Sequence, residues 1–234
     1  MVGPYLPGLF WNRGCEYSRV IGFLYSSVGI YTTPLGVAAR WVFVFLFFGA
    51  LLKNCGAGDL FIDVAKATVG RARGGVSKVP LISSAFFGTI SGAAVANVVL
   101  TGSITIPAMK KEGVRAHIAG AIEAAASTGG QLMPPVMGAA AFLMADILGV
   151  PYGAIITAAF IPACLYYISI YVILDQVSAK TGMGEIKGEI PPLWKVMVQR
   201  GYLLLPLVAI IFVLVGLEQS PNRAALVGIL STIV

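Results

Sequence analysis

A nearly uncharged run from Val79 to Met109 is the feature that most constrains how this chain folds. The run is too long for one membrane crossing of roughly 20 helical residues and too short for two crossings with a turn. Lys and Arg collect on the cytoplasmic side of membrane proteins, so both basic ends of the run are expected on that side. We therefore predict a re-entrant hairpin that enters from the cytoplasm and returns. The basic residues at its ends are Arg71, Arg73 and Lys78 before it, and Lys110, Lys111 and Arg115 after it.

The middle of this run, from Gly88 to Asn97, is rich in small residues and suits an unwound hairpin tip. Non-helical backbone at membrane depth is tolerated only inside protein or beside a water-filled cavity. A hairpin of this kind therefore indicates a transporter or a channel.

The composition agrees with an all-α polytopic membrane protein. The chain is 58% hydrophobic and 11% charged, far more apolar than an ordinary soluble domain. Its net charge of +6 would suggest nucleic acid in a soluble protein, but here the positive charges lie between apolar segments and need no such partner. The cysteines Cys15, Cys55 and Cys164 are scattered and imply neither a disulfide framework nor a zinc site.

Hydropathy and charge divide the chain into four parts. We expect a transmembrane helix at Leu35–Leu52, an amphipathic cytoplasmic helix at Asp59–Val69, a polar cytoplasmic loop at Gln176–Arg200, and a crossing at Gly201–Leu217. The last run, Ala224–Val234, has about half the length of a span, which predicts a fragment. Residues 1–34 form a periplasmic or interfacial segment, and residues 35–78 hold the first helix and the amphipathic helix. Residues 79–148 hold the hairpin and a broken helix. Residues 149–234 hold further transmembrane helices, the first of which is Val150–Leu174.

The segment Ile118–Leu148 is long enough to cross the membrane but is interrupted at its centre. Gly129 and Gly130 permit unusual dihedral angles, and Pro134 and Pro135 remove two amide donors. We predict a discontinuous helix with halves at Ile118–Ser127 and Pro135–Leu148, joined by extended backbone.

A hairpin tip and a broken helix are two devices from which secondary transporters build binding sites, because unwound carbonyls coordinate cations and helix N-termini face anions. Sodium, a hard cation, suits hydroxyl and carbonyl oxygens. The alternative is that small residues let helices pack closely, and that Asn97 caps a helix. The candidate sodium ligands are Ser91, Gly92, Asn97, Ser127, Thr128 and Gly129.

Glu123 is the carboxylate that lies well inside an apolar segment, which makes it a functional candidate. It could bond amides freed at the break, contribute to a cation site, or brace Gln131 or Asn97 as a structural acceptor. Pro134 is more typical of a helix breaker than of a substrate contact. Because His117 stands alone and no catalytic set or phosphate-binding loop is present, we expect neither an enzyme nor use of ATP.

Two blocks carry a specific resemblance to a known family. The first block resembles the large membrane subunit of tripartite ATP-independent periplasmic (TRAP) transporters. It consists of Phe87–Gly92, Ala96–Val99 and Thr101–Lys111. The block Ala121–Phe142 resembles the TAXI branch, which is often made as a fused permease. The resemblance extends from about Gly3 to the end of the chain.

The resemblance implies a sodium-driven, elevator-type importer of small organic anions such as carboxylates in the cell inner membrane, with no cofactor beyond sodium. It also implies two protein partners, a periplasmic solute-binding protein and a small membrane subunit or fused equivalent. By motif match, the ion site falls on Ser91, Gly92, Ser127, Thr128 and Gly129. Ala93 stands where the family pattern has a second serine, so one hydroxyl is missing.

The resemblance further implies that a second, inverted copy of the hairpin and broken helix supplies the other half of the site. Two other functions stay open. One is a free-standing, hairpin-type, ion-coupled anion transporter, and the other is a non-transporting membrane scaffold. The sequence identifies neither the solute nor the sodium stoichiometry.

Overall fold

The computed structural model describes residues 16–26, 31–182 and 190–233, and within them the regular elements are all helical. A glycine with φ of +92°, Gly56, kinks the chain between α3 and α4. The helices are α1 (Tyr17–Leu24), α2 (Thr33–Val37), α3 (Phe43–Leu52), α4 (Gly58–Val69), α5 (Gly75–Ser91), α6 (Ala94–Lys111), α7 (Ala116–Gly129), α8 (Ala139–Leu148), α9 (Tyr152–Thr181), α10 (Leu193–Arg200), α11 (Leu205–Ile211) and α12 (Pro221–Ile233). Short π-helical or 3₁₀ turns at Ala38–Val42, Lys53–Ala57, Gly201–Leu204 and Phe212–Gly216 continue neighbouring helices.

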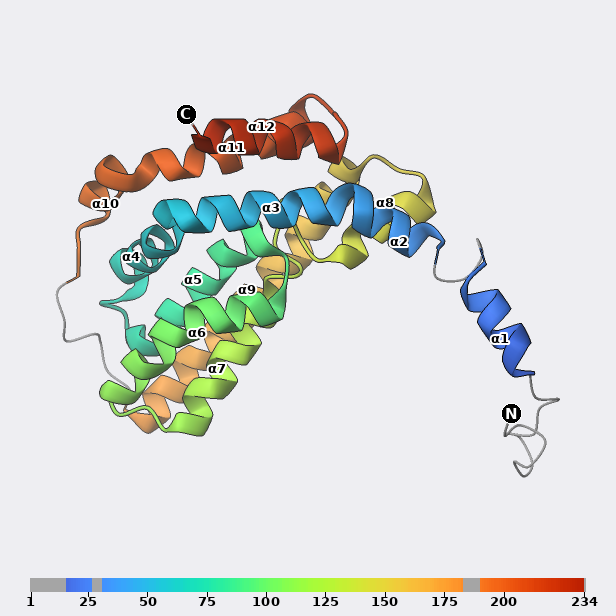
Figure 1. The fold of residues 1–234 in the computed structure, drawn as a ribbon. Coiled ribbons are helices and arrows are strands. Elements are labelled where there is room, and N and C mark those ends of the chain that lie inside the picture. The colour runs from blue at the N-terminus through green and yellow to red at the C-terminus, as the bar shows by residue number, and fades with distance from the viewer. Residues whose placement is uncertain (1–15, 27–30, 183–189, 234) are drawn as a thin grey trace.

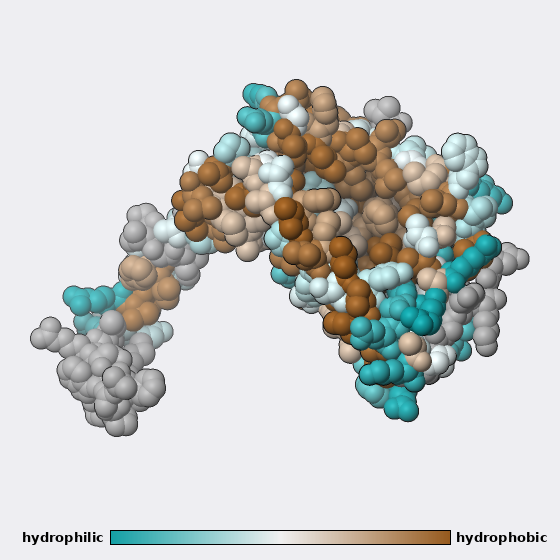
Figure 2. All heavy atoms as spheres, turned by 180° about the vertical axis from the view of Figure 1, so that it is seen from behind, coloured by the Kyte–Doolittle hydropathy of each residue, from teal (hydrophilic) through white to brown (hydrophobic). Residues whose placement is uncertain are grey.

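Among the described residues, three helical segments are long and apolar enough to cross a membrane: Pro34–Val69, which is kinked at Gly56, Tyr152–Lys180 and Leu193–Gly216. Large apolar side chains stand exposed along them, such as Ile161 on α9 and Val208 on α11. Figure 2 shows apolar residues spread over much of one face, with hydrophilic residues gathered at one end of the body. Exposed apolar surface on this scale is typical of protein in contact with lipid.

The helices form two groups in Figure 1. Helices α5, α6 and α7 pack against one another and, through α5 and α7, against α9. Helix α3 packs against α12, which lies against α11, while α4 bridges to α5. The helical hairpin and α7, the first half of the predicted broken helix, therefore share one compact group.

Each group has its own apolar core. One core contains Phe48, Leu60 and Phe142 and joins α3, α4 and α8 to α11 and α12. The other contains Leu81 and Met109 and joins α5, α6, α7 and α9. Van der Waals packing of these side chains stabilises the arrangement of the helices.

The hairpin predicted for Val79–Met109 is present as α5 and α6, but its tip is much shorter than expected. The region from Gly88 to Asn97 was predicted to be unwound, and that prediction was wrong. Helix α5 continues to Ser91 and α6 begins at Ala94, because helical hydrogen bonds satisfy more backbone groups than an open loop does.

The broken helix is also present, with boundaries that differ from the prediction. Helix α7 continues through Gly129, and α8 begins only at Ala139. We call residues 130–138 the helix break. Gly129 still belongs to α7 and Gly130 keeps right-handed geometry as its C-cap, whereas Met137 has a φ of +53°. The break therefore begins at Gly130 rather than after Ser127.

The prediction of a polar loop over Gln176–Arg200 was wrong at both ends. Helix α9 extends to Thr181, and Leu193–Arg200 forms α10, whose charged side chains lie outside while Val196 is buried. The described charged residues of this region, Lys180, Lys195 and Arg200, lie on helices, and counting charge alone does not distinguish such helix ends from a loop. Residues 183–189 lie outside the described part of the chain, as does most of the segment 1–34.

Candidate functional site

The hairpin tip is a two-residue turn whose first residue must be glycine. Gly92 ends α5 with a φ of +58°, and a Cβ built on it would lie 1.8 Å from the carbonyl oxygen of Met137. Ala93 is extended and leads into α6. The turn therefore brings backbone directly against backbone of the helix break, a contact that only glycine permits.

The helix break folds back on itself through a small number of backbone contacts. The amide of Gly138 donates to the carbonyl of Gln131 at 2.8 Å, and the Pro134–Pro135 peptide is cis. The hydroxyl of Tyr152 lies 2.7 Å from the carbonyl oxygen of Val136, to which it donates. These contacts hold the break as a defined loop in which Met137 adopts a left-handed conformation, a state that costs energy in a residue other than glycine.

Two glycines form the second contact between hairpin and break. A Cβ on Gly88 would lie 2.3 Å from the Cα of Gly130, so α5 and the start of the break touch through their main chains. Asn97 fills the adjacent space, and its amide nitrogen donates to the carbonyl of Ser84 at 3.0 Å. Hairpin and break are thus packed as closely as two backbones allow.

Four helix ends converge at this junction. Helices α5 and α7 end there, and helices α6 and α8 begin there. Helix C-termini carry partial negative charge and N-termini partial positive charge. Within the described residues, no hydrogen bond reaches the carbonyl oxygens of Gly92 or Met137, and the Met137 oxygen lies against the Cα of Gly92. The arrangement can therefore attract a cation to carbonyl oxygens and an anion to neighbouring amides.

A hollow of about 770 Å³ opens beside the junction. Its wall is largely apolar, with side chains from α3, α8 and α9 opposite the tip. Polar groups reach it chiefly from Ser91 and Gln131 and from the main chain of the tip and the break. Its lining includes Phe45, Phe142 and Ile155.

The structure brings some of the predicted site residues together and separates others. Ser91 and Gly92 lie at the tip, where the Ser91 hydroxyl accepts from the Ala93 amide at 3.4 Å. Thr128 is exposed on α7 and donates to its own helix, at Ala124, over 2.7 Å. Gln131 is exposed and Pro134 is half-buried in the break.

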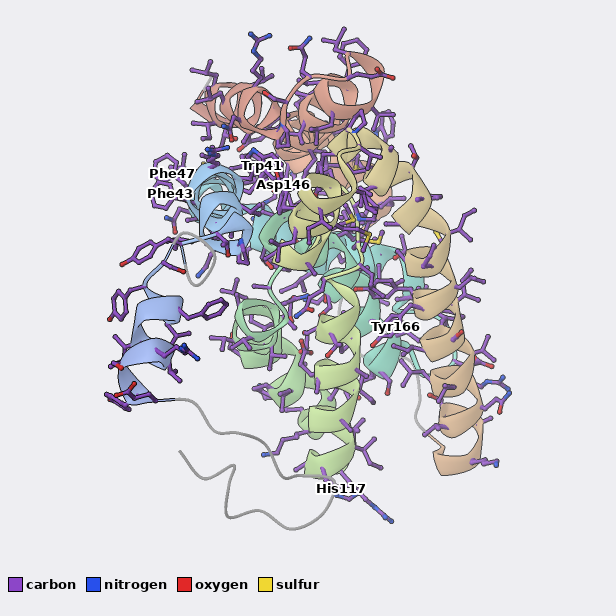
Figure 3. The ribbon with its side chains drawn as sticks, turned by 90° about the vertical axis from the view of Figure 1, so that its right-hand side faces the viewer. Trp41, Phe43, Phe47, His117, Asp146 and Tyr166 are labelled. Atoms are coloured by element: carbon purple, nitrogen blue, oxygen red, sulfur yellow. The ribbon has the colours of Figure 1, made fainter. Side chains whose placement is uncertain are left out.

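Gly129 has a packing environment that the sequence did not suggest. A Cβ there would lie 2.4 Å from the ring of Tyr166 and 2.9 Å from that of Tyr167, so the glycine makes room for α9. Figure 3 shows Tyr166 between α7 and α9, while His117 stands at the far end of α7. His117 is exposed there, away from the junction.

Ser127 belongs to a buried polar group that we call the Glu123 cluster, which also contains Ser84, Thr101 and Thr105. Glu123 is fully buried, and its carboxylate accepts hydrogen bonds from hydroxyls on three helices. The predicted contacts with Gln131 or Asn97, or with amides of the break, are not among those formed by the described residues. Sequence reasoning missed the two threonines, although the four-residue spacing of Asn97, Thr101 and Thr105 was a visible signal.

Among the described residues no cluster of His, Cys, Asp and Glu could hold a metal ion. The site is therefore built from main-chain groups and hydroxyls at the meeting point of two interrupted helical elements inside an apolar helical protein. This combination defines a polytopic membrane protein of the transporter class.

The chain belongs to the family of the tripartite ATP-independent periplasmic transporter, DctM component, whose model matches residues 25–234. This family is a transporter permease family and not an enzyme family. The chain is 30% identical over 134 residues to the C4-dicarboxylate TRAP transporter large permease protein DctM of Pseudomonas aeruginosa, over 57% of this chain and 31% of that protein.

Two further relatives carry different names. The sialic acid TRAP transporter permease protein SiaT of Haemophilus influenzae is 28% identical over 57% of this chain and 21% of its own length. The isethionate TRAP transporter permease protein DctMQ of Oleidesulfovibrio alaskensis is 37% identical over 38% of this chain and 14% of its own length. The matched region thus covers less than a third of these relatives.

Proposed function

We propose that this chain forms one half of the transport site of a sodium-driven importer of small organic anions. The hairpin α5–α6 would be re-entrant, and the break between α7 and α8 would lie near the middle of the membrane. The complete site would need a second, inverted hairpin and break. The carbonyl oxygens of Gly92 and Met137, which accept no hydrogen bond from the described residues where the hairpin tip meets the helix break, are the observation that supports this proposal best.

The chemistry of the junction favours a cation of low charge. Carbonyl and hydroxyl oxygens are hard ligands, and the tip offers the Ser91 hydroxyl beside the two free carbonyls. The N-termini of α6 and α8 lie within reach of the same place and suit a carboxylate or sulfonate group. Ion occupancy would order the tip and thereby raise anion affinity, which is how a sodium gradient drives uptake.

The partners follow from the family. We propose a periplasmic solute-binding protein that delivers the anion and a small membrane subunit, and we assign the chain to the TAXI branch, in which the small subunit is fused. The membrane would be the cell inner membrane. The relatives named for C4-dicarboxylates, sialic acid and isethionate support an anionic solute and do not favour one of them.

Uptake measurements test this function directly. The complete permease would be reconstituted into proteoliposomes with its binding protein, and labelled carboxylates supplied with and without an inward sodium gradient and without ATP. We expect accumulation that requires both the gradient and the binding protein. Uptake without the binding protein would indicate a free-standing transporter, and absence of uptake would indicate a scaffold.

Ser91 provides the test of the ion site. Ser91→Ala removes one oxygen at the tip, and we expect the sodium concentration for half-maximal uptake to rise about tenfold, which corresponds to the loss of one polar contact. Ser103→Ala, which removes an exposed hydroxyl from the same hairpin, is the matched control. Unchanged sodium dependence in Ser91→Ala would show that the Ser91 hydroxyl at the tip is not part of the ion site.

Gly129→Val is unsuitable for this purpose. Its side chain would collide with Tyr166 and Tyr167. A loss of activity in that variant would report packing rather than ion binding.

A further inference from the structure

The Glu123 cluster lies outside the junction and has no part in the proposed coordination. Each of the three packed helices contributes to it, with Ser84 from α5, Thr101 and Thr105 from α6, and Glu123 and Ser127 from α7. All five side chains are at most 2% exposed. A carboxylate buried this deeply is costly unless its oxygens are satisfied.

Hydroxyl groups satisfy both oxygens of the carboxylate. Thr105 lies 2.5 Å from Oε2, while Thr101, Ser127 (3.2 Å) and Ser84 (3.3 Å) contact Oε1. The nearest lysine along α5, Lys78, pairs instead with Asp175 on α9. Glu123 is therefore held by hydrogen bonds across helices, without a salt bridge to any described residue.

A chain of contacts connects this cluster to the junction. The Thr101 hydroxyl lies 3.4 Å from Oδ1 of Asn97, whose Nδ2 donates to the main chain of Ser84. A Cβ on Gly130 would lie 3.0 Å from that same nitrogen. Asn97 therefore stands between the cluster and the first residue of the helix break, and its amide is occupied on both sides.

We propose that Glu123 is a positioning residue for cation binding. It supports the ion site without touching the ion. It ties both arms of the hairpin to α7. Through Ser84, whose hydroxyl donates to Glu123 and whose main-chain carbonyl accepts from Asn97, it also holds Asn97 against the helix break. The inference rests on the proposed function, since it assigns Glu123 to the same ion site. Preorganised ligands bind more tightly because less ordering remains to be paid for on binding.

Hydrogen bonds fix the relative positions of the helices better than apolar packing does. A leucine at position 123 would fill space but would not fix how far α6 slides along α7, whereas hydroxyls bonded to one carboxylate fix that register. The threonines also have alternative acceptors, since Thr101 lies 2.8 Å from the Asn97 carbonyl and Thr105 lies 2.9 Å from the Thr101 carbonyl. A glutamine at position 123 can therefore donate to the hydroxyl oxygens and keep the arrangement.

The experiment compares Glu123→Ala with Glu123→Gln in the complete permease reconstituted with its binding protein. We expect Glu123→Ala to raise the half-saturating sodium concentration about tenfold while the rate at saturating sodium falls less than threefold. Glu123→Gln should stay within about twofold of the wild type in both quantities. The matched controls are Glu112→Ala and Glu112→Gln, at an exposed glutamate at the end of α6, with no change expected.

Thr101→Val provides a second route if Glu123→Ala yields no folded protein. It removes the hydroxyl by which α6 donates to Glu123, and we expect about a threefold rise in half-saturating sodium, with Thr101→Ser restoring the wild-type value. A purely structural role would lower the maximal rate and leave the half-saturating concentration unchanged, which would overturn the inference while the proposed function stands. A wild-type permease that ignores sodium would overturn both.

Discussion

The two ends of the hairpin are held in different ways. At its base, Arg73 and the buried Lys78 both pair with Asp175 of α9, and the ammonium of Lys78 lies 4.3 Å above the ring of Tyr171. The hydrogen bond to Asp175 raises the pKa of Arg73. At its tip no charged side chain takes part, and Gly88 and Gly92 bring main chain against main chain.

The base and the tip of the hairpin therefore have different roles: the base attaches the hairpin to α9, and the tip carries the candidate ion site. Charged pairs at the base fix the hairpin to α9 and leave no group free for a ligand. Glycine contacts at the tip hold the hairpin and the break together while their carbonyl oxygens remain available. Under the function proposed above, the absence of a charged side chain at the tip would favour ion release, because a fixed carboxylate beside the ion would bind it more strongly.

The largest effect is expected at the base. Asp175→Asn leaves Lys78 as a buried cation without its partner, and we expect the unfolding temperature in detergent to fall by about 5 °C or more. The double variant Asp175→Asn with Lys78→Met should recover much of this loss, because an apolar side chain of similar size needs no partner.

Asp63→Asn serves as the control for that experiment. Its pairing with Arg200, at 3.4 Å, lies near the surface, where ion pairs contribute little. If the double variant were no more stable than Asp175→Asn alone, burial of the Lys78 charge would not be the cause of the loss.

An intermediate effect is expected at the tip. Gly88→Ala places a methyl group 2.3 Å from the Cα of Gly130, so α5 and the break must separate, at a cost of about 2 kcal/mol in the free energy of unfolding. Gly120→Ala, also inside a helix but with open space around it, should be neutral or stabilising by about 0.5 kcal/mol. Equal stability of the two variants, measured by chemical denaturation, would contradict the close contact.

The smallest effect is expected for the hydrogen bond that Tyr152 donates to the helix break. Tyr152→Phe keeps the ring stacked on Phe142, 4.4 Å between centroids, but removes the hydroxyl that donates to Val136. We expect a loss of about 1 kcal/mol and faster amide hydrogen exchange within residues 130–138. Tyr202→Phe is the exposed control, and exchange that rises equally in both variants would count against a role for the Tyr152 hydroxyl.

Local patterns were enough to predict the helical class, the hairpin and the interrupted helix. The uncharged run Val79–Met109 between basic ends indicated α5 and α6, and Pro134 with Pro135 indicated the break, because proline removes donors wherever it stands. The boundaries were less predictable. Gly129 permits an open backbone and tolerates a helix equally, so packing against Tyr166 and Tyr167 decides between the two.

The sequence by itself determined that this chain is an apolar helical protein with one hairpin and one broken helix, since these follow from residue spacing and side-chain chemistry. Only the tertiary structure decided which polar groups meet. Ser127, predicted as a sodium ligand, lies in the Glu123 cluster, and the Met137 carbonyl oxygen lies against Gly92, which is forty-odd residues away along the chain. Main-chain carbonyls are present at every residue, so only the fold selects the few that remain free.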